Sequence, residues 1–101
     1  MSTKPWVRSL VHLQEFISYV IVYAPDAFPE EDYLGPDEQM SLNKAFVEMR
    51  RGVEFVRTKI SDEAVLAHLE GLLEESLEAY EDGDDVKGAK LLQVFEDQIF
   101  S

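Results

Sequence analysis

The chain has 101 residues, of which 46% are hydrophobic and 30% charged, and it carries a net charge of −12 at pH 7. The mixture of charged residues with large apolar ones excludes a disordered acidic tail and predicts a single folded domain over residues 1–101. The absence of cysteine excludes disulfides, a thiolate nucleophile and a cysteine-based zinc site. The negative charge is concentrated, because residues 61–82 carry −8 without a lysine or arginine and residues 23–38 carry −6.

The first helix is predicted over residues 4–23, with Ser2 or Thr3 as N-cap and Pro5 in the first turn. Apolar residues recur along one face at helical spacing: Trp6, Leu10, Leu13, Ile17, Val20 and Ile21. A second apolar set extends around the helix: Val11, Tyr19, Val22 and Tyr23. The run YVIVY within this helix is also compatible with a strand, but the sequence offers no second strand to pair with it.

Residues 24–36, APDAFPEEDYLGP, predict a long acidic loop, because three prolines and a glycine interrupt any helix. Three further helices are predicted over residues 37–60, 62–82 and 85–100, the second with Ser61 as its N-cap. Their short connections favour antiparallel neighbours, so the predicted fold class is all-α and four-helix bundle-like. The residues expected in its core include Phe46, Leu69 and Phe95.

The apolar run from Phe16 to Ala24 is too short to span a bilayer, and polar residues before it interrupt any signal-peptide core. We therefore expect a cytoplasmic protein that does not enter a membrane. The net negative charge also argues against direct binding to nucleic acid phosphates or to anionic lipid.

The helix predicted over residues 62–82 carries glutamates opposite its apolar stripe: Glu70, Glu74, Glu78 and Glu81. A row of this kind is most often only a solvated face, and arginines and lysines of the preceding helix are expected to neutralise part of it. The other interpretation is a docking surface for a basic partner protein. The acidic loop would then form its second half, through Glu30, Glu31 and Asp32.

The second apolar set on the first helix has three interpretations. Scattered exposed apolar residues are normal, and the acidic loop would also cover them if it folds back over the helix. The third is a self-association patch, which would make the protein a homodimer. We expect this patch to comprise Val11, Tyr19, Val22 and Tyr23.

No group of residues predicts catalysis, because no serine lies in a nucleophile elbow and no glycine-rich loop could hold a phosphate. The clustered carboxylates lie on faces expected to be solvated, which does not suit them to acid–base catalysis. We therefore expect a non-enzymatic acidic protein-interaction domain of the inhibitor, immunity or adaptor type, binding a basic partner without a cofactor.

Two alternatives stay open. In the first, His68 serves a phosphotransfer or metal-binding regulatory bundle. The stretch AHLEGLL is similar to the AHxLKG motif of histidine phosphotransfer domains, although Gly71 comes one residue early and Glu70 replaces a basic residue. In the second, the protein mimics a nucleic acid. Glutamates four residues apart rise by about 6 Å along a helix, close to the spacing of phosphates in a single strand.

Overall fold

The computed structural model describes residues 6–24, 27–30, 35 and 39–100, and these contain four helices and no strand. The helices are α1 (Leu10–Tyr23), α2 (Leu42–Val56), α3 (Glu63–Glu81) and α4 (Asp85–Phe100). The all-α prediction is therefore confirmed for the described residues, and YVIVY is helical. The predicted loop over residues 24–36 falls partly outside them, and its described residues after Ala24 are not helical.

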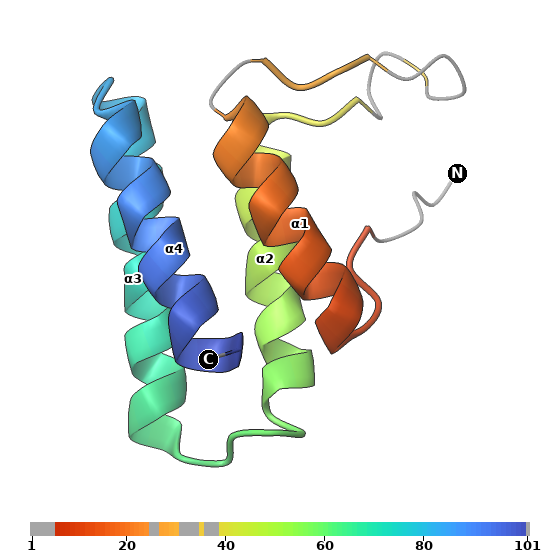
Figure 1. Cartoon of the computed structure of the whole chain (residues 1–101), viewed down its shortest axis with the longest axis vertical. Coiled ribbons are helices and arrows are strands. Elements are labelled where there is room, and N and C mark those ends of the chain that lie inside the picture. The colour runs from red at the N-terminus through yellow and green to blue at the C-terminus, as the bar shows by residue number, and fades with distance from the viewer. Residues whose placement is uncertain (1–5, 25–26, 31–34, 36–38, 101) are drawn as a thin grey trace.

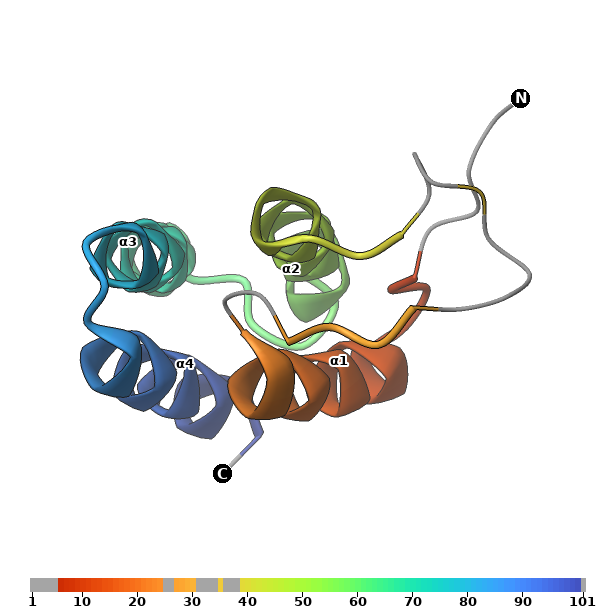
Figure 2. The same cartoon turned by 90° about the horizontal axis from the view of Figure 1, so that it is seen from above.

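The four helices form a ring in which each packs against two neighbours (Figures 1 and 2). Helix α1 contacts α2 and α4, and α3 contacts the same two helices, so α1 and α3 occupy opposite corners. Successive helices run in opposite directions (Figure 1), which the short connections predicted for α2, α3 and α4. The most extensive contact is between α3 and α4. None of the described helices has the length and apolar character needed to cross a membrane.

The core fills the space between the helices and uses the predicted apolar faces. The exposed fractions of Phe46, Leu69 and Phe95 are 2%, 0% and 0%, which confirms that these residues are buried. Val7 and Phe16 are buried as well, although the apolar pattern did not place them in the core.

The start of α1 differs from the prediction. The helix begins at Leu10 rather than near Lys4, and its N-cap is Ser9, whose Oγ accepts a hydrogen bond from the backbone N–H of His12 at 3.2 Å. The predicted caps at positions 2 and 3, and Pro5, lie outside the described residues. Residues 6–8 precede the helix, and the Glu48 carboxylate of α2 accepts hydrogen bonds from the backbone N–H groups of Trp6 and Val7.

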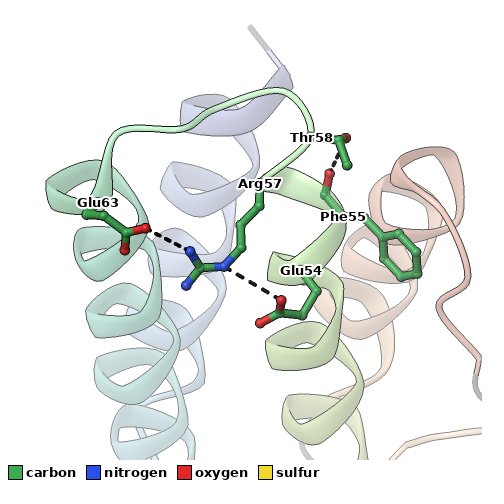
Figure 3. A network of polar contacts seen from close by, with 5 residues as sticks. All are labelled: Glu54, Phe55, Arg57, Thr58 and Glu63. Carbon is green, nitrogen blue, oxygen red and sulfur yellow. Dashed lines mark hydrogen bonds and ion pairs between the residues drawn. The ribbon is translucent and has the colours of Figure 1, made fainter.

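Helix α2 is shorter than predicted at both ends. It begins at Leu42 rather than near residue 37, with the Ser41 Oγ accepting from the Lys44 N–H at 3.3 Å. It ends at Val56 rather than Ile60, and a turn over residues 57–59 follows. There the Thr58 hydroxyl donates to the Phe55 carbonyl at 2.7 Å (Figure 3).

Helix α3 is capped by Asp62 rather than Ser61, and the Asp62 carboxylate accepts from the Ala64 N–H at 2.9 Å. Serine and aspartate cap helices about equally well, so adjacent candidates leave the start of a helix ambiguous by one residue. The turn after α3 contains Gly83, whose φ of 87° lies in the left-handed region that favours glycine.

The C-terminus of α4 is stabilised by a lysine from the turn after α2. Helix α4 has no basic residue in its last turn. The Lys59 ammonium donates to the Ile99 carbonyl at 2.7 Å and lies 5.5 Å from the centre of the Phe100 ring. A cation here satisfies a free carbonyl and interacts favourably with the helix dipole.

We expect Lys59→Met to reduce the free energy of unfolding by about 1 kcal/mol, because it keeps the aliphatic stem but removes the charged donor. Amide hydrogen exchange should accelerate most in the last turn of α4. Lys90→Met, on the exposed surface of the same helix, is the matched control. Equal effects of the two substitutions would contradict this role of Lys59.

Candidate functional site

The acidic face of α3, defined as Glu70, Glu74, Glu78 and Glu81, lies where the sequence predicted it. All four side chains are exposed, and the row extends over about 16 Å of helix. The other residues predicted for this docking surface, from the acidic loop, do not extend the acidic face within the described residues. Glu30 is exposed in the segment after α1, and Glu31 and Asp32 lie outside the described residues.

Arg57, in the turn after α2, neutralises only the first turn of α3. Arg57 lies 3.0 Å from the Glu63 carboxylate and 3.6 Å from that of Glu54 (Figure 3). Arg51 instead pairs within α2 with Glu48, at 3.6 Å. Within the part of the chain that the structure describes, no lysine or arginine forms an ion pair with any residue of the acidic face of α3. The predicted compensation is therefore confined to the end where α2 and α3 are joined.

The tyrosines of α1 lie in an aromatic cluster rather than in an open patch. The Tyr19 ring lies between 5.1 and 5.9 Å, centre to centre, from four other rings. Those rings belong to Trp6, Phe16, Tyr23 and Phe28. Phe28 belongs to the segment after α1, which agrees with the interpretation that this segment folds back over the helix.

The predicted self-association residues separate into two pairs. Tyr19 and Tyr23 are half-buried in the aromatic cluster, whereas Val11 and Val22 are 63% and 68% exposed. The two valines are about 16 Å apart along the helix axis, and exposed polar residues lie between them. The described residues therefore do not form one continuous apolar patch on α1, and the homodimer stays a prediction.

An open depression of about 320 Å³ lies against α1, and we call it the α1 depression. Four of its residues are three or four positions apart and so share one face of the helix, while the fifth comes from the segment before α1. The lining residues are Trp6, His12, Glu15, Phe16 and Tyr19. The sequence did not predict this site, because Trp6 was expected to lie inside a continuous first helix. Ser9, an N-cap candidate three residues later, was the available signal.

The position of Trp6 is determined by α2. The Glu48 carboxylate, with a side chain only 12% exposed, accepts from the backbone N–H of Trp6 at 2.8 Å and of Val7 at 3.1 Å. Gly52 allows this close approach, since a Cβ there would lie 2.6 Å from a methyl group of Leu13 and 3.2 Å from one of Val7. One wall of the α1 depression is thus built by a contact between distant parts of the chain.

A second depression, of about 400 Å³, lies on α4 and differs in character. Its lining combines two lysines with one aspartate and three aliphatic residues: Asp84, Val86, Lys87, Lys90, Leu91 and Val94. The two ammonium groups make it a poor site for a basic ligand.

The titratable side chains of the described residues do not gather into a metal site. His12 and His68 are both exposed, and no group of three or more His, Asp or Glu side chains in the described ranges could hold a metal ion. Tyr80 is buried between α3 and α4, where burial and, to a smaller extent, the charge of Asp85 raise the pKa of its hydroxyl.

Comparison of the chain with known protein families, curated proteins and solved structures finds no match.

Proposed function

We propose that the protein is a non-enzymatic interaction domain of the inhibitor, immunity or adaptor type, which binds a basic partner protein through the acidic face of α3. The observation that carries this proposal is the row of four exposed glutamates without an ion pair among the described residues. Glutamates nearby do have such partners, as Glu48, Glu54 and Glu63 show. A one-sign surface of this kind attracts an oppositely charged partner and accelerates its association.

The spacing of the glutamates also favours the binding of cations to this face. Glu70, Glu74 and Glu78 follow one another at intervals of four residues, and like charges at this interval destabilise a helix by about 0.2–0.5 kcal/mol per pair. The net charge of −12 adds a long-range contribution of the same sign. A basic partner would relieve this repulsion, whereas an apolar or acidic partner would not.

We expect the triple substitution Glu70→Gln, Glu74→Gln and Glu78→Gln to leave the free energy of unfolding unchanged or to raise it by up to about 1 kcal/mol. The association rate constant with a cationic probe, such as polylysine, should fall at low salt, and the difference should shrink as salt is added. Stopped-flow measurements at several ionic strengths test both expectations.

The matched control removes three charges that lie outside the acidic face of α3, through Glu54→Gln in α2, Glu63→Gln in the first turn of α3 and Glu96→Gln in α4. Because both variants change the net charge equally, a larger loss in the first variant supports a specific role for the acidic face of α3. Association that is insensitive to salt and to the first variant would contradict the electrostatic proposal. Equal losses in the two variants would assign the effect to net charge alone.

A further inference from the structure

The α1 depression combines two features that together suit one kind of ligand. Three aromatic side chains line it, and their rings lie 5.6–6.0 Å apart, centre to centre: Trp6, Phe16 and Tyr19. Phe16 is buried beneath the other two, which are half-buried and supply the accessible ring surface. Glu15 lies on the same lining and is exposed, and it forms no ion pair with the lysines and arginines that the structure describes. An aromatic surface beside an unpaired carboxylate favours a cation with a flat, weakly hydrated face.

We propose that the α1 depression receives an arginine side chain from a basic partner protein. A guanidinium group stacks on aromatic rings and donates two parallel hydrogen bonds to a carboxylate, so it uses both features of the site at once. This inference rests on the proposed function in that the partner is basic. The site is nevertheless separate from the acidic face of α3, because α1 and α3 lie at opposite corners of the ring (Figure 2).

The depression is already formed in the free protein. Glu48 holds the backbone of Trp6 and Val7, and Gly52 lets this segment lie close against α2. The Trp6 ring packs against Phe16 and Tyr19, at 6.0 and 5.9 Å between ring centres, and these contacts restrict its orientation before a ligand binds. A site that needs no ordering retains more of its contact energy as affinity. Aromatic and arginine side chains are also the most frequent centres of binding energy at protein interfaces.

The chemistry of the lining distinguishes arginine from other occupants. A lysine ammonium is compact and strongly hydrated, so it gains less from the rings. A quaternary ammonium group would use the rings but has no N–H to donate to Glu15. A second copy of this chain also carries a net charge of −12, so electrostatic repulsion would oppose its approach to the site.

The sole tryptophan of the chain, Trp6, lies in the proposed site, so its fluorescence reports binding there directly. Two capped peptides that are identical except for arginine or lysine at the central position would be titrated into the protein at constant ionic strength. A third titration with tetramethylammonium tests a ligand that can use only the rings. We expect a saturable change in Trp6 fluorescence that is stronger with the arginine peptide than with either other ligand.

We expect Glu15→Gln to weaken binding of the arginine peptide about tenfold, because it removes a charged hydrogen-bond acceptor from an exposed position without changing the shape of the side chain. Glu74→Gln removes one charge from the acidic face of α3 and is the matched control, with an expected change within about twofold. Tyr19→Leu should also weaken binding, because it removes a stacking surface.

Equal binding of the arginine and lysine peptides, or binding unaffected by Glu15→Gln, would overturn this inference. A Trp6 signal that changes on dilution of the protein alone would overturn it as well, in favour of a second copy as the occupant. This test is independent of the test of the proposed function, which measures polylysine association and its dependence on Glu70, Glu74 and Glu78. If only the peptide titration fails, the acidic face of α3 keeps its proposed role.

Discussion

Phe95→Ala is expected to reduce the free energy of unfolding by about 3–5 kcal/mol, the largest loss that we predict for a single substitution. Phe95 has an exposed fraction of 0% and belongs to the core between the four helices. Its truncation loses the transfer free energy of the ring, and the cavity that it leaves adds a further cost because the surroundings could fill it only if a helix moved. Chemical denaturation followed by the helical circular dichroism signal measures this loss.

Val86→Ala on the same helix is the matched control, because Val86 is 66% exposed. We expect it to change the free energy of unfolding by less than about 0.5 kcal/mol. A loss below about 1 kcal/mol for Phe95→Ala would mean that α4 does not pack into the ring through this residue.

Gly88→Ala is expected to destabilise the protein by about 1–2 kcal/mol, as overpacking outweighs the gain in helix propensity. A Cβ at this position would lie 2.7 Å from two ring carbons of Tyr80, which is buried and packs edge-on against Phe46. The ring cannot move aside freely, so α3 and α4 would have to separate. Separation would also strain the hydrogen bond of 2.8 Å from the Ser76 hydroxyl to the Gly88 carbonyl.

Gly71→Ala provides a control with the opposite expected sign. Gly71 also lies in a helix, but a Cβ there would meet nothing within 4 Å. The substitution should therefore stabilise the protein by up to about 1 kcal/mol through helix propensity alone. Thermal and chemical denaturation of the two variants compare them directly. A gain in stability for both would contradict the close approach of α3 and α4 at Gly88.

The core could be predicted from the sequence because its signal is local and repeated. Phe46, Leu69 and Phe95 each belong to a row of large apolar residues at helical spacing, and a single row leaves little choice about which face is buried. The ends of the helices were less predictable. Ser61 and Asp62 both suit an N-cap, and the choice between such neighbours depends on the connection to the preceding helix.

The two candidate surfaces differ in the same way. The acidic face of α3 follows from four glutamates spaced along one helix, so the sequence alone predicts it. The α1 depression depends on a hydrogen bond between Glu48 and Trp6, which are 42 positions apart. No periodic pattern contains that contact, and the helix expected from residue 4 onward placed Trp6 on its core face. The pairing of Arg51 with Glu48 is different, because the two residues are only three positions apart in α2, a spacing at which side chains meet on a helix.

Binding of a basic partner to the acidic face of α3 is tested most directly by the backbone amide spectrum of the isotope-labelled protein. We predict that polylysine at low salt shifts the amide signals between Glu70 and Glu81 most strongly, and that added salt reverses these shifts. Shifts concentrated instead around the depression on α4, at Val86, Lys90 and Val94, with α3 unaffected, would contradict the claim.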